Sequence, residues 1–213
     1  METRRIGILG SGDVGQALGR GFARHGWDVK LGTRRPDELR TSMDEGDGVS
    51  VGTFAEATTH GDVVVLAVRG DAAEAVVEMV GAANFAEKLV LDATNPLDFS
   101  SGDVHLSFGG TDSLGERIQA KLPDASVVKC FNTVSNIQMI DPEFEAGTPP
   151  MFICGNDDEA KAQTEEILVE LGWPGAMDVG DITAARYLEA LVPLWVRVGS
   201  NLRTWKHAFT AVQ

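Results

Sequence analysis

Residues 6–35 constrain the fold more than any other part of the chain. Residues 6–9 are apolar and predict a buried strand. Three glycines then follow at the spacing G-x-G-x-x-G, namely Gly10, Gly12 and Gly15. From Val14 onward, apolar or small residues recur at i, i+3, i+4, i+7 and i+8, which is the period of one helix face. With a second strand predicted at 28–31, this order is typical of a dinucleotide-binding βαβ unit.

Each glycine of this turn has its own physical use. Gly10 permits the tight turn out of the strand, Gly12 lets a pyrophosphate approach the backbone, and Gly15 lets the helix pack closely on the strand. The helix N-terminus adds free N–H groups and a partial positive charge. The alternative is a glycine-rich turn without a ligand, since the chain has 24 glycines. The flanking strands and helix favour dinucleotide binding.

The end of the second strand indicates which dinucleotide binds. An NAD site usually has Asp or Glu there, to bond the ribose 2′-hydroxyl. This chain has Thr33, Arg34 and Arg35 instead, and no carboxylate before Asp37. Guanidinium groups present fork-shaped donors to phosphate oxygens, so the sequence predicts NADP. The alternative is a solvated basic turn ahead of a proline.

Strands and helices alternate along the rest of the chain. Further strands are expected at 49–54, 63–68, 89–91, 126–131, 151–155 and 176–179. Helices are expected at 54–58, 72–80, 113–122, 156–171 with Asn156 as N-cap, and 183–209, with a short helix or loop at 37–48 and irregular chain at 99–110. This alternation predicts an α/β fold, a doubly wound, mostly parallel Rossmann-type sheet. We expect residues 1–180 to form the nucleotide-binding domain and 181–213 a helical extension of the same compact unit.

Ligands of such sheets bind beyond the carboxyl ends of the strands. Small and polar residues collect at those expected ends, as a long flat ligand would require. The segments concerned are 10–15, 33–35, 68–70, 93–95 and 132–133. Each alone could be an ordinary turn, but five at one sheet edge predict a site.

Charge and cysteine content restrict the partners. The net charge of −14 argues against general binding of nucleic acid or an anionic membrane. Cys130 and Cys154 both lie in apolar runs, so two buried thiols and a cytoplasmic location are expected. The first apolar run stops at Gly10, too short for a signal peptide, and no stretch has membrane-spanning length.

No acid, base or metal ligand stands out. The four histidines are scattered without metal-ligand spacing, and G-x-S-x-G is absent. Tyr187 is followed four residues later by Leu191, so the tyrosine–lysine pair of short-chain carbonyl reductases is missing. Hydride exchange between two flat rings needs stacking and no strong protein acid, whereas carbonyl reduction needs a proton donor. Ring-to-ring exchange is therefore favoured; a small-carbonyl reductase and a non-catalytic NADPH sensor are the alternatives.

The last expected helix has a wide apolar face. Its members are Leu188, Leu191, Val192, Trp195, Val198, Gly199 and Leu202, extended by Trp205 and Phe209. Ordinary core packing explains such a face, and so does packing against a second subunit or a flat aromatic ligand. We expect a homodimer that uses it. Lys206 is placed on the same helix and is expected to be solvated.

Several motifs together resemble the NADPH-dependent oxidoreductases that reduce the deazaflavin coenzyme F420. They are I-L-G-S-G-D-V-G, L-G-T-R-R-P, V-V-V-L-A-V, K-C-F-N-T-V, F-I-C-G-N-D-D-E-A-K and L-E-A-L-V-P-L-W, and they span nearly the whole chain. The first of them are shared with β-hydroxyacid dehydrogenases and flavin-using metalloreductases. The resemblance implies NADP as cofactor and a deazaflavin or a flavin as the second, small-molecule substrate.

The resemblance also implies that Ser11, Asp13, Val14, Val68 and Arg69 join the arginine turn in lining the NADP site. Asp13 is a carboxylate near a pyrophosphate, and we expect it to partner the helix amides. Arg69 stands where the deazaflavin enzymes tend to have proline and an aromatic residue. The complete set of candidate cofactor-binding residues is Gly10, Ser11, Gly12, Asp13, Val14, Gly15, Thr33, Arg34, Arg35, Ala67, Val68, Arg69, Thr94, Asn95, Asn132 and Thr133.

Overall fold

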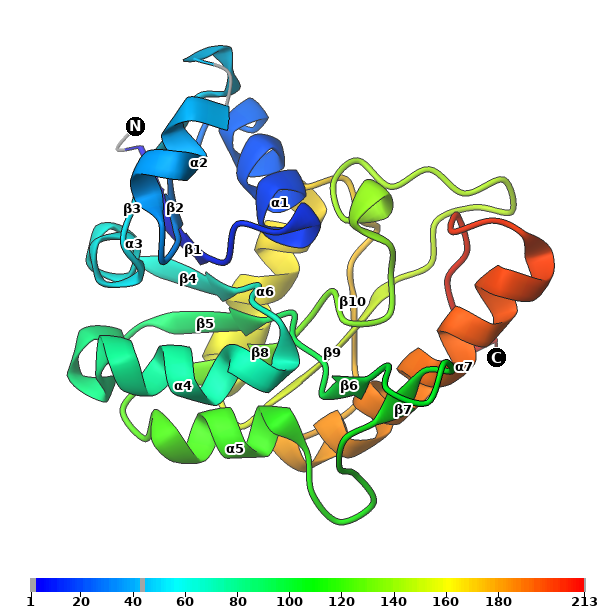
Figure 1. Ribbon diagram of the computed structural model, residues 1–213. Coiled ribbons are helices and arrows are strands. Elements are labelled where there is room, and N and C mark those ends of the chain that lie inside the picture. Colours follow the sequence, from blue (N-terminus) through cyan, green and yellow to red (C-terminus); the bar gives the residue numbers. More distant parts are fainter. Residues whose placement is uncertain (1–2, 43–44, 213) are drawn as a thin grey trace.

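The computed structural model describes residues 3–42 and 45–212, and its centre is an eight-stranded sheet of order β10-β9-β8-β5-β4-β1-β2-β3 (Figure 1). The strands are β1 (Arg5–Leu9), β2 (Asp28–Gly32), β3 (Val49–Gly52), β4 (Val63–Leu66), β5 (Leu89–Asp92), β8 (Ser126–Lys129), β9 (Met151–Gly155) and β10 (Ala176–Asp178). From β3 to β8 every pair is parallel, whereas β9 runs antiparallel to β8. The mostly parallel, Rossmann-type α/β sheet is thus confirmed.

Helices cover both faces of this sheet, and a long helix follows at the C-terminal side (Figure 1). Their bounds are α1 (Asp13–Arg24), α2 (Pro36–Ser42), α3 (Phe54–His60), α4 (Gly70–Val80), α5 (Leu114–Lys121), α6 (Asp158–Glu170) and α7 (Ala185–Leu202). The segment 99–110, which was expected to be irregular, contains β7 (His105–Leu106), and β7 pairs antiparallel with β6 (Leu97–Asp98) just before the segment. Of the segment 37–48, residues 43 and 44 lie outside the described residues.

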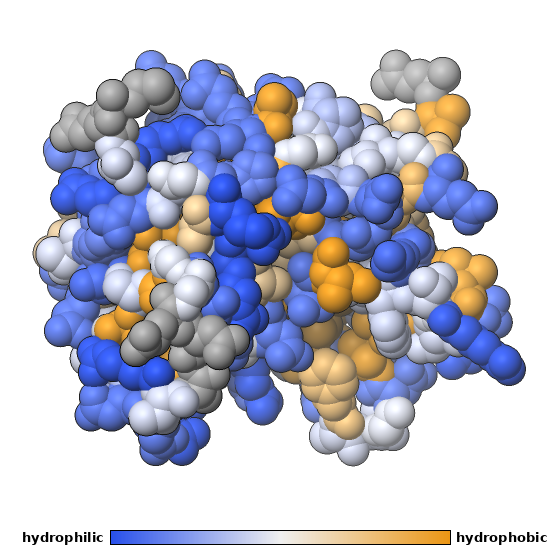
Figure 2. Space-filling model, turned by 90° about the horizontal axis from the view of Figure 1, so that it is seen from above, coloured by the Kyte–Doolittle hydropathy of each residue, from blue (hydrophilic) through white to orange (hydrophobic). Residues whose placement is uncertain are grey.

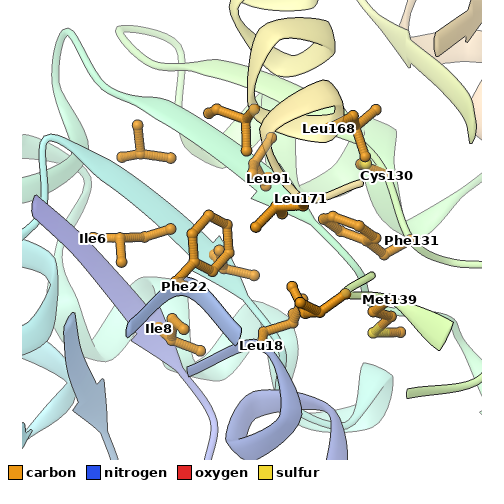
Figure 3. Close-up of a cluster of buried hydrophobic side chains, with 14 of the residues drawn as sticks. Ile6, Ile8, Leu18, Phe22, Leu91, Cys130, Phe131, Met139, Leu168 and Leu171 are labelled. Carbon is orange, nitrogen blue, oxygen red and sulfur yellow. The ribbon is translucent and has the colours of Figure 1, made fainter. Parts of the chain in front are cut away.

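Alternation along the strands divides the core into two layers. Ile6 and Ile8 of β1 point to the α1 and α6 face, where they belong to one buried cluster with Leu18, Phe22 and Leu168 (Figure 3). The alternate residues of the strands point to the opposite face of the sheet, where α3, α4 and α5 cover them. Both faces of the parallel strands are therefore buried, as their continuous apolar sequence requires.

The N-cap of α6 differs from the sequence expectation. Asp157, not Asn156, caps this helix, and its carboxylate accepts a hydrogen bond from Ala160 N at 2.7 Å. Asn156 Oδ1 accepts instead from Ile182 N at 3.0 Å, which ties the strand end to the segment before α7. The prediction of Asn156 was wrong because an equally good capping residue stood beside it and a long-range partner was available.

The helical prediction through residue 209 was also wrong. Helix α7 ends at Leu202, Arg203 adopts a left-handed conformation with φ of 57°, and the chain turns back. The ring of Trp205 lies against Gly199, where a Cβ would meet it at 2.7 Å. Because glycine leaves room for this ring, the tail folds onto α7, and neither Trp205, Lys206 nor Phe209 extends the helix.

The folded-back tail covers the central part of the apolar face of α7. The ring of His207 stacks on Trp195 at 4.6 Å between centroids, and Trp195 Nε1 donates to His207 O at 3.1 Å. Trp195 is consequently only 8% exposed. The basis for expecting a dimer through Trp195 is therefore gone, because the chain's own tail fills that place.

Candidate functional site

The turn after β1 is built as the glycine spacing predicts. Gly10 has a φ of 134°, which favours glycine, and its N–H donates to Gly32 O at 3.0 Å. A Cβ on Gly15 would overlap the carbonyl oxygen of Gly10, so only glycine lets α1 start this close to the strand. No heavy atom lies within 4 Å of the place where a Cβ on Gly12 would stand. The space over Gly12 is open toward a ligand.

The end of β2 places the two arginines beside this turn. Ser11 Oγ and Thr33 Oγ1 are hydrogen-bonded at 3.1 Å, which joins the glycine turn to the β2 end. Arg34 and Arg35 are both exposed. Arg35 Nη1 lies 2.9 Å from Glu38 Oε2, while none of the ion pairs of the described residues includes Arg34.

These two segments form one side of a cavity of about 750 Å³ at the carboxyl edge of the sheet. That volume lies within the usual range of ~300–1,000 Å³ for ligand pockets. The start of α4 and the loop after β5 form the other side, at the edge toward which β4 and β5 point (Figure 1). Predicted residues that line the cavity are Gly10, Ser11, Gly12, Asp13, Val14, Thr33, Arg34, Arg35, Ala67, Val68, Arg69, Thr94 and Asn95.

Three predicted residues do not line it. Gly15 acts in packing, as its close approach to Gly10 shows. Asn132 is buried behind Asn95, and its Nδ2 donates to Asn95 Oδ1 at 3.2 Å and to Leu188 O at 2.8 Å. Thr133 faces a separate small hollow that it shares with residues of the 203–212 tail. Asp13 is the first residue of α1, and among the described residues its carboxylate accepts no hydrogen bond from the helix amides, so the expected capping is not made.

An apolar wall of the cavity was missed from the sequence. Ala72, Ala75, Val76 and Met79 lie at i, i+3, i+4 and i+7 of α4 and all face the cavity. Phe54, Leu97 and Phe99 complete this wall. The helix period was present in the sequence, but the apolar stripe was indistinguishable from a core face. The side chain of Met79 is 65% exposed and that of Phe99 62%, so this part is open to a ligand.

A buried group of charges behind the cavity was missed too. It consists of Asp92 at the end of β5, Lys129 at the end of β8, and Glu189 on α7. Lys129 Nζ lies 2.9 Å from Asp92 Oδ2 and 2.8 Å from Glu189 Oε1, and none of the three side chains is more than 2% exposed. Burial alone would lower the pKa of Lys129, but the two carboxylates outweigh it and raise the pKa above its ordinary value. We call these three residues the buried charge centre.

The cysteines are inert in this structure. Both thiols are buried and free, which confirms the expectation of two buried thiols. Burial raises the pKa of Cys154 to about 12 and raises that of Cys130 as well, so both stay protonated at neutral pH. Within residues 3–42 and 45–212, no His, Cys, Asp and Glu side chains gather in a group that could hold a metal ion. None of the helices described there is both long and apolar enough to cross a membrane.

The cavity suits a dinucleotide phosphate. The open space over Gly12 would be filled by a Cβ, and the N-terminus of α1 points its free N–H groups there. Arg34 and Arg35 supply positive charge at one end. Thr94 and Asn95 add uncharged residues to the lining, which suit a carboxamide-bearing ring, and their side chains are fixed by bonds to Asp92 and Asn132.

One solved structure agrees with this chain over its whole length. A crystal structure of an Arthrobacter sp. FB24 protein, assigned to the F420-dependent NADP reductases, superposes with a TM-score of 0.94 and 36% identity over 100% of both chains. The chain belongs to the coenzyme F420-dependent NADP oxidoreductase family. The family model itself, NADP oxidoreductase coenzyme F420-dependent, matches residues 5–96, which hold the glycine turn, the arginines and Thr94.

Two curated relatives extend this result. The F420-dependent NADP reductase of Methanocaldococcus jannaschii is 24% identical over 212 residues, covering 93% of each chain. The metalloreductase STEAP3 of Rattus norvegicus is 28% identical over 198 residues, or 91% of this chain. The chain spans 38% of the length of that metalloreductase. Membership makes this chain an NADP-dependent oxidoreductase, an enzyme of an NADP(H)-binding family.

Proposed function

We propose that this family member transfers hydride between NADPH and a flat redox ring, a deazaflavin such as coenzyme F420 or a flavin. The proposal rests on one observation above all. Among the described residues that line the cavity there is no histidine, lysine, tyrosine or cysteine. Tyr187 lies on α7 with 74% of its side chain exposed, and Lys206 is in the exposed tail. Neither lines the cavity, so neither is in place to protonate a carbonyl oxygen there.

The chain's part in this reaction is binding and orientation. When bound, NADPH supplies the hydride from its nicotinamide ring. Gly12 and the start of α1 hold the pyrophosphate, and Arg34 and Arg35 hold the 2′-phosphate through charge-assisted hydrogen bonds. Thr94 and Asn95 hold the nicotinamide end. Stacking two flat rings at near-attack distance lowers the barrier without an acid or a base.

The second substrate enters from the open, apolar side of the same cavity. Leu97 and Phe99 stand next to Asn95 and offer flat apolar surface to a ring. Aromatic side chains favour offset or edge-to-face contacts with such rings. The F420 part of the proposal is further supported by the activity after which the family and the Methanocaldococcus relative are named.

The test is anaerobic oxidation of NADPH by three classes of acceptor: a deazaflavin, FMN and riboflavin, and a panel of small ketones and aldehydes. We expect turnover with ring acceptors and none with carbonyls. Deuterium from [4-²H]NADPH should appear at carbon 5 of the deazaflavin, because a carbon-bound hydrogen does not exchange with water. Carbonyl-only turnover would replace this proposal by the reductase alternative. Tight NADPH binding without any turnover would make the chain a sensor.

A further inference from the structure

The buried charge centre makes hydrogen bonds to the protein backbone in addition to its ion pairs. Lys129 Nζ donates to Thr94 O at 2.6 Å. Asp92 Oδ1 accepts from Thr94 N at 2.9 Å and from Thr94 Oγ1 at 2.6 Å. The backbone N–H, the carbonyl and the hydroxyl of this one cavity residue are therefore all held by two buried charges. Thr94 is only 2% exposed, so these charged partners take the place that water has at an exposed loop residue.

The third member connects the centre to other elements. Glu189 Oε2 and Oε1 accept from the N–H groups of Leu114 and Gly115, both at 2.9 Å, at the first turn of α5. The centre carries one positive and two negative charges, and the positive end of α5 compensates the excess. One turn of α7 is thus bonded directly to α5 and β8, and through Lys129 to β5.

A parallel set of bonds holds the next cavity residue. Asn95 Nδ2 donates to Asn132 O at 3.1 Å, and Asn132 Nδ2 donates both to Asn95 Oδ1 and to Leu188 O. Leu188 directly precedes Glu189. The two residues at the nicotinamide end are therefore each connected to the same turn of α7.

Stability alone is a weak reason for such a centre. Removing charges from water costs several kcal/mol per ion, and apolar replacements of buried ion pairs are often neutral or stabilising. What apolar side chains could not do is hold the three polar groups of Thr94 in one orientation.

We propose that the buried charge centre is a positioning device for the nicotinamide end of the cofactor. Lys129 and Glu189 are positioning residues, which act through Thr94 and Asn95 without touching the ligand. This inference rests on the proposed function in one respect, that the nicotinamide lies against Thr94 and Asn95. The adenosine end, held by Gly12 and the arginines, is independent of the centre.

The test separates the two halves of the cofactor. The variants are Glu189→Gln, Asp92→Asn and Lys129→Met, and the control is Arg186→Met. Arg186 joins α7 to α5 through Glu116 at 2.7 Å but bonds neither Thr94 nor Asn95, so it tests loss of an α7 contact alone. Each protein is titrated with NADPH and with 2′,5′-ADP, which has the adenosine half only. The fluorescence anisotropy of the reduced nicotinamide is read at saturating protein.

We expect the centre variants to weaken NADPH by about tenfold, the loss of one hydrogen bond to a charged group. Bound nicotinamide should become mobile, with lower anisotropy, while 2′,5′-ADP affinity stays within about twofold. The control should lose thermal stability and keep all three ligand properties. If Lys129→Met does not fold because two carboxylates are left unpaired, the isosteric Glu189→Gln and Asp92→Asn carry the test.

Unchanged anisotropy and NADPH affinity in folded Glu189→Gln and Asp92→Asn would overturn the inference. Parallel losses of NADPH and 2′,5′-ADP would also overturn it, because the centre would then support the whole fold. Failure of the proposed function would be seen in a different measurement, because the wild type would then bind NADPH but pass hydride to no ring acceptor.

Discussion

The glycines of the turn after β1 have separable roles at the scale of single residues. Gly12→Ala should fold normally, since nothing lies within 4 Å of the added methyl and a φ of −77° suits alanine. It should lose NADPH affinity by about tenfold or more, because the methyl occupies the pyrophosphate space. Gly15→Ala should unfold at lower temperature, since its Cβ overlaps Gly10 O, and overpacking costs ~1–3 kcal/mol. Thermal unfolding and NADPH titration of both variants check this pair; normal NADPH affinity in Gly12→Ala would contradict the site.

Both arginines should contribute to NADP selectivity. Arg34→Ala or Arg35→Ala should each weaken NADPH by about tenfold, because charge-assisted bonds are worth ~1.5–3 kcal/mol. NADH lacks the 2′-phosphate and should bind almost unchanged. Arg35 already pairs with Glu38, so Glu38→Gln should free it and tighten NADPH. Equal effects on NADPH and NADH in any of the three would end the 2′-phosphate assignment.

Residue-scale chemistry was predictable where it is local in sequence. A glycine turn and a basic pair are visible in the sequence itself, as the spacing of Gly10, Gly12 and Gly15 and as the adjacent Arg34 and Arg35. The buried charge centre is not visible there, because Lys129 is 37 residues from Asp92 and the Glu189 contact at Gly115 spans 74 residues. A charged residue at the end of an apolar run reads as a strand terminus, and only the folded sheet brings the three together.

At the scale of elements, the contact of α5 with α7 should make stability depend on acid pH. Hydrogen bonding to Arg186 lowers the pKa of Glu116 below its ordinary value of 4.5. A lowered folded-state pKa stabilises the protein above 4.5, and this contribution is lost as pH falls through the folded pKa. Glu116→Gln should therefore be less stable than wild type at neutral pH, and the difference should shrink below about pH 4. Urea unfolding across this range measures it; a constant difference would contradict the linkage.

Elements were predicted well and their directions and ends less well. Each expected strand of the sheet is present, and its expected and observed ends differ by two residues at most. Apolar runs and helical periods allow this because they are local signals. The run Met151–Gly155 gave no sign that β9 would be antiparallel, because an apolar run has no direction. The end of α7 depends on the Trp205 ring finding room at Gly199, a contact that the helical period cannot show.

At the scale of the whole molecule, we propose a homodimer through the outer side of α7. Tyr187, Leu194 and Leu202 are 74%, 53% and 56% exposed and recur at helical spacing. Hydrophilic residues cover most of the face in Figure 2, where apolar residues form separate small patches.

Leu194→Glu places a charge among the exposed apolar residues of α7 and should therefore give a monomer. Light scattering at micromolar concentration, at several salt levels, should detect the change. A wild-type monomer under all these conditions would refute the proposal.

The position of the cavity was predictable from topology alone. Parallel strands bring their carboxyl ends to one edge, so five segments far apart in sequence were expected together. Four of them do meet around one cavity. The fifth, 132–133, lies behind it, because Asn132 turns its side chain toward Asn95 and α7.

The stacking of His207 on Trp195 gives the molecule a built-in optical signal. These rings are 4.6 Å apart at 14°, and Trp195 is only 8% exposed while the tail is docked. Release of residues 203–212 would uncover this indole, and an indole in water emits at a longer wavelength than a buried one. The wavelength of tryptophan emission would therefore report whether the tail is folded onto α7, without any added label.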